Sequence, residues 1–383
     1  VKQFVDVQRL KVTFPGIVNL SGDFNMSLKP RPHADKLAFN LKVDDFKQFN
    51  DLYLKNILEG TDYEELDIKG GFQAEFEKQY DQYKLTSNFG ALSLSYNKQV
   101  TVVGLNGILN WTNRKLIESE IKDSQLRWEE LILNDLPFGQ ANLNFRFYDE
   151  QLKLLKETDI PLFDGSLHIN TLDISQLGII KQYHTGLTLT IDGMIKPISL
   201  EQVSSHFNWP LLDGQLSAVI PSTTYNRHFL KVGGAIMLKV FDGVTIIKDL
   251  QIEQPLSESA RMYADIDLNN LNLQSLTKTY NFGEIEGRIE GKFSNLILDS
   301  WQPVQFDAYF RTPENDKSRH RISQRAIDNL SSLGGASGIL SRSFLSFFQT
   351  FGYDKLGLSC KLKNSICLMD GIENKSGDSA GYY

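Results

Sequence analysis

The stretch "FGEIEGRIEGKF", residues 282–293, separates its apolar and charged residues by strict alternation. Glycine, isoleucine and phenylalanine occupy the odd-numbered positions from 283 on, and glutamate, arginine and lysine occupy the even-numbered ones. A helix would spread these charges around its circumference, whereas successive side chains of a strand point to opposite faces. The stretch therefore predicts a β-strand with one apolar face and one charged face.

Three glycines, Gly283, Gly287 and Gly291, recur at every fourth residue on the apolar face of this expected strand. Glycine weakens a strand and is typical of places where another group approaches the backbone closely. One interpretation is bulges and close packing between layers, and the other is shallow notches in an apolar trough. The sequence leaves both open.

The same alternation appears in "ANLNFRFY" (141–148), "GLTLTIDG" (186–193) and "VQFDAYF" (304–310). Strands with one apolar and one polar face are typical of antiparallel sheets, because both faces of a parallel sheet are usually covered. Asp-Gly pairs near such stretches, among them Asp164-Gly165, Asp192-Gly193 and Asp242-Gly243, predict hairpin turns or bulges. We therefore expect a mainly β protein built on antiparallel sheet.

Longer segments repeat this arrangement. Residues 172–195 resemble residues 271–293: each has a strand end, a short leucine-bearing helical turn, a tyrosine and a glycine-marked strand. Residues 43–60 form a third, looser copy with a longer helix. Repeated strand–short helix–strand units predict a sheet that is extended by adding units.

The region 322–351 departs from the strand pattern and predicts two helices. Ser323 is the expected cap of the first, whose apolar residues follow at helical spacing: Ala326, Ile327, Leu330 and Leu333. The second follows "GGASG" and carries a wide apolar stripe: Ile339, Leu340, Phe344, Leu345, Phe347, Phe348 and Phe351. This helix either packs on the apolar face of the sheet or also touches lipid.

Residue constellations of known enzymes are absent from the sequence. The six histidines are far apart and show no metal-ligand spacing: His33, His168, His184, His206, His228 and His320. The run "GRIEGKF" is one residue short of a phosphate-binding loop, with Phe293 where Ser or Thr would bind magnesium, and no serine lies in G-x-S-x-G. We therefore predict no catalytic residues, no metal and no cofactor.

The charge and hydropathy of the sequence bear on two kinds of partner, nucleic acid and membrane. The chain of 383 residues carries a formal charge of -7 with scattered basic residues, which argues against nucleic-acid binding. No apolar run reaches the roughly 20 residues that cross a bilayer. The sequence begins at Val1 without a leader and ends at Tyr383 in what resembles the start of another strand, so we expect a fragment of a longer protein.

The two cysteines lie in "CKLKNSIC", at positions 360 and 367. A turn around Lys363-Asn364 would make Cys360 and Cys367 direct cross-strand partners, about 4.5 to 5.5 Å apart at Cα, within the range of a disulfide. Six intervening residues do not match a CxxC metal or redox site. We predict a disulfide-closed hairpin, which indicates an oxidising compartment; two reduced cysteines in a cytosolic protein are the alternative.

The C-terminal third resembles a known family. The runs "LNLQSLTKTYNFGEIEGRIEGKFSNLILDSWQPVQFDAYFRT", "RISQRAIDNLSSLGG" and "FGYDKLGLSCKLKNSICLMDGI" are similar to the C-terminal region of the YdbH family, AsmA-like envelope proteins of Gram-negative bacteria long labelled a dicarboxylate transport family. The similarity is most specific from about residue 265 to 372 and looser from about 160 to 264. A dicarboxylate transporter fits poorly, because no spanning helix or clustered basic pocket is visible.

The resemblance implies an inner-membrane anchor, followed by a long periplasmic sheet curled into an apolar groove of the β-taco type that moves phospholipids between the inner and outer membranes. It also implies an outer-membrane lipoprotein partner that adds strands near the C-terminal end. The chain departs from the family by lacking the anchor and by ending before the family's last strands. Membrane contact would then come through that missing anchor.

These observations define one set of expectations. The chain would comprise two groove segments, 1–160 and 161–321, and a C-terminal cap, 322–383, with a helical pair and the disulfide hairpin. The residues expected to line the groove are Phe145, Phe147, Leu187, Leu189, Ile191, Ile285, Ile289, Phe306 and Phe310. The expected function is phospholipid transport in the periplasm; the alternative is a non-catalytic envelope scaffold that binds the lipoprotein through open sheet edges.

Overall fold

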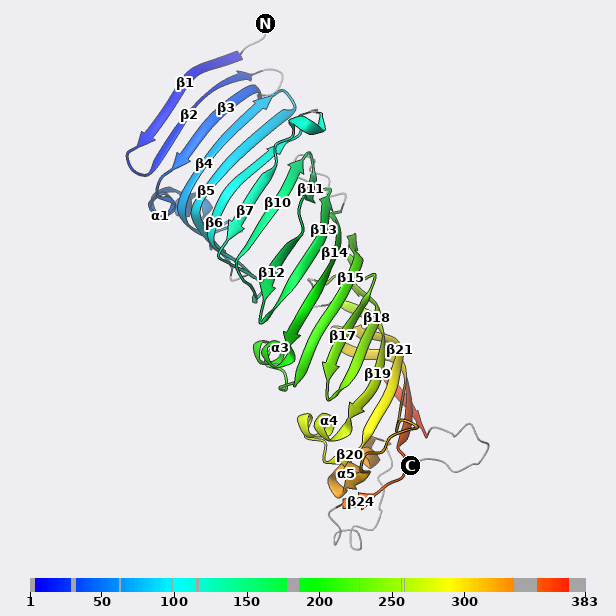
Figure 1. Ribbon diagram of the computed structural model, residues 1–383. Helices are drawn as coiled ribbons and strands as arrows, with labels where there is room; N and C mark the ends of the chain where they lie inside the picture. Colours follow the sequence, from blue (N-terminus) through cyan, green and yellow to red (C-terminus); the bar gives the residue numbers. More distant parts are fainter. Residues whose placement is uncertain are drawn as a thin grey trace. The chain divides into compact units, whose positions relative to one another are not determined.

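A computed structural model describes residues 4–28, 32–61, 63–97, 99–114, 117–177, 186–226, 228–255, 257, 259–333 and 350–371. The protein is mainly β, as the alternating sequence predicts, with antiparallel strands and short helices (Figure 1). It divides into two compact units, Val1–Gly193 and Met194–Tyr383. This division does not coincide with the segment boundaries expected after residues 160 and 321.

The first unit begins with six long strands that pair antiparallel in chain order. They are β1 (Phe4–Phe14), β2 (Val18–Ser27), β3 (His33–Val43), β4 (Asp67–Gln79), β5 (Gln82–Tyr96) and β6 (Val100–Thr112). Shorter strands follow: β7 (Ser124–Trp128), β8 (Glu130–Leu133), β9 (Leu136–Phe138), β10 (Ala141–Tyr148), β11 (Gln151–Leu154), β12 (Thr158–Leu162) and β13 (Gly165–Ser175). Strand β14 (Thr188–Ser199) contains the division between the units.

The second unit contains one large antiparallel sheet and one small one. The large sheet comprises β15 (Gly214–Asn226), β16 (Phe229–Lys231), β17 (Ala235–Val240), β18 (Gly243–Glu253), β19 (Arg261–Asn272), β21 (Arg288–Asp299), β22 (Gln302–Arg311), β25 (Gly357–Lys363) and β26 (Ile366–Asp370). The small sheet comprises β20 (Ile285–Glu286), β23 (Arg321–Ser323) and β24 (Thr350–Gly352).

Short helices lie between these strands. They are α1 (Phe46–Phe49), the π-helix η1 (Asn50–Leu54), α2 (Lys55–Leu58), the 3-10 turn η2 (Glu118–Glu120), α3 (Leu200–His206), α4 (Leu273–Thr279) and α5 (Gln324–Leu333). The predicted cap of α5 is confirmed, because the backbone N–H of Ala326 donates to Ser323 Oγ over 3.3 Å. The predicted second helix falls mostly on residues 334–349, outside the described residues. Phe351 was wrongly assigned to that helix: it lies in β24, paired with Ile322.

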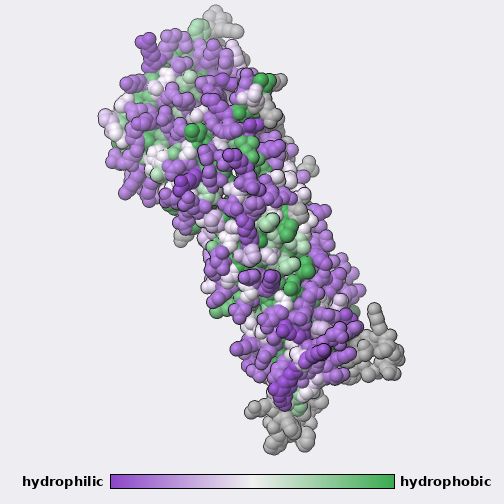
Figure 2. Space-filling view, viewed as in Figure 1, coloured by the Kyte–Doolittle hydropathy of each residue, from purple (hydrophilic) through white to green (hydrophobic). Residues whose placement is uncertain are grey.

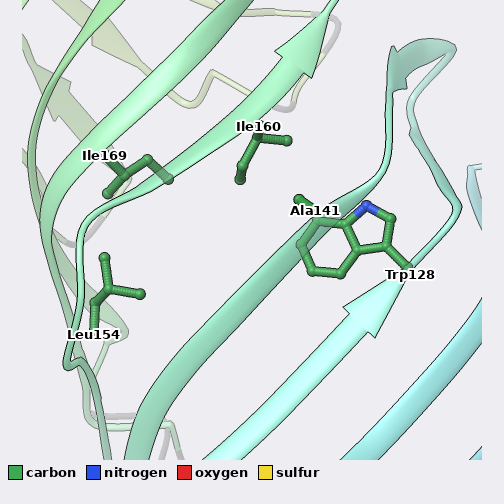
Figure 3. Packing of buried hydrophobic residues seen from close by; sticks show 5 residues of the cluster. All are labelled: Trp128, Ala141, Leu154, Ile160 and Ile169. Carbon is green, nitrogen blue, oxygen red and sulfur yellow. The ribbon is translucent and has the colours of Figure 1, made fainter.

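The strand pairing gives the first unit one apolar face. Directly paired residues form a row across five strands: Phe14, Val18, Val43, Phe72 and Phe89. Further along the unit, five buried residues form a cluster from β7, β10, β11, β12 and β13: Trp128, Ala141, Leu154, Ile160 and Ile169 (Figure 3). Removing this apolar surface from water stabilises the unit. Polar residues cover most of the surface visible in Figure 2.

The glycine-rich stretch at 282–293 forms two strands rather than the single strand that its alternation predicts. Residues Ile285–Glu286 pair with β23 in the small sheet, and Arg288–Asp299 pair with β19 in the large one. Gly287 separates them with φ +138°, and a Cβ there would lie 2.2 Å from Tyr353 Oη. Gly287 therefore agrees with the close-packing interpretation of the glycines, because the Tyr353 side chain approaches the backbone there.

The predicted Asp-Gly turns are confirmed only in part. Asp242 is the second residue of the β17–β18 turn, and Asp164 of the β12–β13 turn, with glycine opening the next strand each time. Asp192-Gly193 instead lies inside β14, so of the two predicted features, a hairpin turn or a bulge, the hairpin turn is wrong there.

A repeat of 73 residues relates β14 and α3 to β19 and α4. Thr188–Ser199 corresponds to Arg261–Asn272, and Leu200–His206 to Leu273–Thr279, without insertion or deletion. The correspondence extends to Gly214 and Gly287, both with positive φ. The sequence suggested a different pairing, of 172–195 with 271–293, whose helical part at 178–185 lies outside the described residues. The helix at 200–206 was not predicted.

Candidate functional site

The large sheet of the second unit also presents one continuous apolar face. One row of directly paired residues crosses eight strands: Ala218, Ile236, Ile247, Ile266, Phe293, Ala308, Cys360 and Met369. Its neighbour crosses seven: Leu216, Leu238, Thr245, Leu268, Gly291, Phe310 and Leu358. Most of these side chains are only half-buried, so the face is not closed over by the described residues.

Three of the predicted groove residues come together on this face. Phe306 and Phe310 lie on β22, with their ring centroids 5.4 and 5.3 Å from that of Phe293 on β21. Ile289 lies on β21 two residues before Gly291, and it pairs with Leu271 on β19. A fourth, Ile285, is buried in a cluster with Ile322 and Ala326 under α5, so it contributes to the core of this end of the unit.

An apolar cavity of about 450 Å³ lies at this end of the face, between α4, α5 and strands β21, β22, β25 and β26. Its lining is Leu273, Leu276, Thr277, Tyr280, Phe282, Ile285, Ile289, Phe310, Leu330, Leu356, Gly357, Leu358 and Met369. The Thr277 hydroxyl donates to the Leu273 carbonyl over 2.8 Å, so its hydrogen is already used. Tyr280 is the one titratable side chain in this lining. The cavity therefore offers dispersion contacts and few polar ones.

The cover of the cavity, α5, is fixed to the segment after α4. Asn329 Nδ2 donates to the Phe282 carbonyl over 2.6 Å, and Arg325 Nη2 donates to the Asn281 carbonyl over 3.0 Å. Gly283, with φ +121°, passes directly beneath Ala326, and a Cβ there would lie 2.6 Å from the Ala326 nitrogen. Glycine at this position allows the helix to approach so closely.

A polar network beside the cavity holds the loop that precedes α5. Asp316 accepts from the backbone N–H groups of Arg288 and Ser318, each over 2.9 Å, and lies 3.0 Å from His320 Nε2. Burial opposes ionisation of Asp316, but hydrogen bonds from Ser318, His320 and Arg288 outweigh it and lower the pKa to about 2. The His320 ring stacks on Tyr353, whose hydroxyl donates to the Glu286 carbonyl.

The remaining predicted groove residues lie in the first unit. Phe145 is buried and pairs with Leu154, and Phe147 is half-buried with its ring centroid 6.1 Å from that of Trp111. Ile191 packs against the Trp128 cluster, and Leu189 is half-buried on the same strand, β14. Leu187 precedes β14 and is exposed. These residues belong to a different unit from Ile289, Phe306 and Phe310.

The disulfide joins Cys360 and Cys367 as predicted, but the predicted register is wrong. The turn is Asn364-Ser365, one residue later than expected, and both residues have positive φ. Cys360 therefore pairs with Met369, and Cys367 pairs with Leu362. The cysteines are diagonal neighbours on the same face, with Cα atoms 5.8 Å apart, within the range that a disulfide spans.

Sequence reasoning missed most of the cavity lining. Leu273, Leu276 and Tyr280 belong to the leucine-bearing helical turn and the tyrosine that the sequence predicted in 271–293, but they were not assigned to a site. Leu356 and Leu358 lie at alternate positions just before Cys360. This pattern indicates a strand, but it does not indicate which strands pair with it. Their convergence depends on pairings between strands distant in sequence, which alternation does not specify.

The described part of the chain contains no helix with the length and hydropathy needed to span a bilayer. Within the same residues, no three His, Cys, Asp or Glu side chains are placed to hold a metal ion. Comparison of the chain with protein-family models, with curated proteins and with solved structures finds no match. The resemblance to the YdbH family stays a hypothesis based on the quoted runs.

Proposed function

We propose that the apolar faces of the two units bind the acyl chains of phospholipids. The chain would then be the periplasmic part of a protein that moves phospholipid between the inner and outer membranes of a Gram-negative bacterium. The role is non-catalytic: an acyl chain requires continuous apolar surface and no polar partner. The observation that supports the proposal best is the half-buried apolar face of the second unit, which leads to the cavity under α5.

The energetics favour such a ligand. Burying a methylene contributes about 0.8 kcal/mol, so ten buried methylenes contribute on the order of 8 kcal/mol before the entropic cost of binding. The cavity volume of about 450 Å³ falls within the size range of small-molecule sites, roughly 300 to 1,000 Å³. The disulfide supports placement in an oxidising compartment such as the periplasm.

Photo-crosslinking tests the proposal with two adjacent positions on β22. Phe310 lines the cavity, whereas Tyr309 lies on the opposite face of the strand and is exposed. A photoreactive residue at position 310 is expected to capture phospholipid in bacterial membranes or with phospholipid vesicles, and one at position 309 is not. Absence of lipid adducts at 310, or equal capture at both positions, would overturn the proposal.

A second candidate function is a scaffold that binds an outer-membrane lipoprotein by strand addition. Ile366 and Leu368 on β26 are 64% and 69% exposed, and β26 pairs only with β25 within the described residues. Exposed apolar edge strands are sites where another chain adds a strand. Ile366→Lys and Leu368→Lys are expected to abolish co-purification of the lipoprotein without changing lipid capture at 310; unchanged co-purification argues against this edge.

A further inference from the structure

Three helical segments of the protein follow a strand in the same way, and each carries a buried polar residue five positions after its N-cap. The N-caps are Asp45, Ser199 and Asn272, and the buried residues are Asn50, Ser204 and Thr277. The hydroxyls of the last two donate to backbone carbonyls of their own helices, Ser204 to Glu201 over 3.2 Å and Thr277 to Leu273 over 2.8 Å.

Asn50 differs from the other two. It is 1% exposed, and neither Oδ1 nor Nδ2 has a hydrogen-bond partner within the described part of the chain. A buried polar group left unpaired costs roughly 1 to 3 kcal/mol. The closed position of this segment therefore contains an unfavourable contribution that the two corresponding helices avoid.

The segment 46–58 covers one end of the apolar face of the first unit. The Phe46 ring lies 6.0 Å from Phe72, and the Tyr53 ring lies 5.2 Å from Phe14. Both partners belong to the row of paired residues at that end of strands β1 to β5, and Val43 in the same row is fully buried. Figure 1 shows α1 at this end of the strands.

The backbone of the segment is also irregular at Asn50. The N–H of Lys55 donates to the Asn50 carbonyl, five residues back, so the turn is wider than in an α-helix. Such π-type turns are rare and occur often at functional sites. On the outer side, Leu52 and Ile57 are exposed. The segment therefore has apolar side chains on both sides and an unpaired amide at its centre.

We propose that segment 46–58 is a lid over this end of the apolar face, and that Asn50 makes its opening easier. When the lid lifts, water hydrates the Asn50 amide and removes the cost of burying it unpaired. The apolar row from Phe14 to Phe89 is then exposed to an entering hydrocarbon. The motion does not depend on the proposed function; only the identity of the entering group rests on it.

Hydrogen exchange of the lipid-free full chain tests the lid. Two variants remove the unpaired amide: Asn50→Leu replaces it with an apolar side chain, and Asn50→Thr introduces the hydroxyl found at the corresponding Thr277. Asn56→Leu is the matched control, because Asn56 lies on the exposed side of the same segment. The backbone amides of residues 50–58 are expected to exchange roughly 10-fold more slowly in both Asn50 variants and at the wild-type rate in the control.

Slower amide exchange in Asn50→Thr, even without slower exchange in Asn50→Leu, also supports the lid, because leucine at this position alters the packing. Unchanged or faster exchange in both Asn50 variants would overturn it. Because no lipid is present, this result is independent of crosslinking at position 310.

Discussion

The two copies of the 73-residue repeat differ in what covers them. After α4, α5 packs against Phe282, Gly283 and Ile285, and Ile285 is 4% exposed, although Tyr280 just before them is 57% exposed. After α3, the corresponding segment leaves Phe207, Trp209 and Leu211 on the surface, with Trp209 57% exposed. Yet the local backbones match: Asn208 and Asn281 both have positive φ, and Trp209 N and Phe282 N donate to Ser204 O and Thr277 O.

One position explains why the copies differ. Gly283 lets Ala326 of α5 approach the backbone, whereas the corresponding residue after α3 is Pro210. The proline ring would occupy the space that a helix packed in the same way needs. The comparison indicates that a short helix at the edge of the sheet is common to both copies, and that Gly283 permits the close approach of α5, whose Leu330 lines the cavity.

The largest effect is expected from making the second copy resemble the first at this position. Gly283→Pro forces φ from +121° to a negative value and places ring atoms against Ala326, which together cost about 4 kcal/mol. Thermal unfolding of the full chain should show a strongly lowered transition for this variant. The reverse change, Pro210→Gly, is expected to cost less than about 1 kcal/mol; equal losses would show that the cover is not what distinguishes the copies.

The next effect compares corresponding apolar residues. Ile285→Ala removes a buried side chain and is expected to cost about 3 kcal/mol, whereas Leu212→Ala, at the half-buried corresponding position, is expected to cost about 1 kcal/mol. Urea denaturation measures both. A Leu212→Ala loss as large as that of Ile285→Ala would mean that the first copy is as closely packed as the second.

A pH dependence is expected of the covered copy, because the Asp316 carboxylate accepts the backbone N–H of Arg288 there. The Asp316 pKa in the folded protein, about 2, lies below its ordinary value of 3.8, so its contribution is complete above about pH 4 and is lost as the pH falls toward 2. The melting temperature of wild type should therefore fall across this window.

Asp316→Asn should reduce that fall and lower stability near neutral pH by roughly 1.5 to 3 kcal/mol, the range for hydrogen bonds to a charged group. If the melting temperature of Asp316→Asn falls as much as that of wild type between pH 4 and pH 2, other carboxylates cause the acid sensitivity.

The smallest effect concerns the buried hydroxyls. Thr277→Val keeps the volume but loses the bond to Leu273, at an expected cost of about 1 kcal/mol. Ser204→Ala should cost slightly more, since Ser204 Oγ also accepts from the backbone N–H of Leu212 over 3.2 Å. Chemical denaturation of both variants measures the difference. An unchanged free energy of unfolding in Ser204→Ala would show that this hydroxyl does not stabilise the repeat.

Alternation in the sequence was sufficient to predict the antiparallel strands, the apolar faces and the positions of Phe306 and Phe310 on one of them. It failed where long-range pairing or backbone conformation decides the outcome. Gly287 divides a uniformly alternating stretch between two sheets because Tyr353, 66 residues later, packs against it. The turn at Asn364-Ser365 shifted the hairpin register by one residue, since two consecutive residues with positive φ form the tight turn there.

The even number of long strands in the repeat has a further consequence. Between α3 and α4 the chain passes through four strand positions, β15, β16 with β17, β18 and β19, each antiparallel to the next. Residues of α4 and of the segment after α3 line a common cleft. Duplicating residues 199–271 would insert four strand positions, about 19 Å of sheet at the usual strand spacing, without exchanging the apolar and polar faces. Gene duplication can thus set the reach of such a protein in fixed increments.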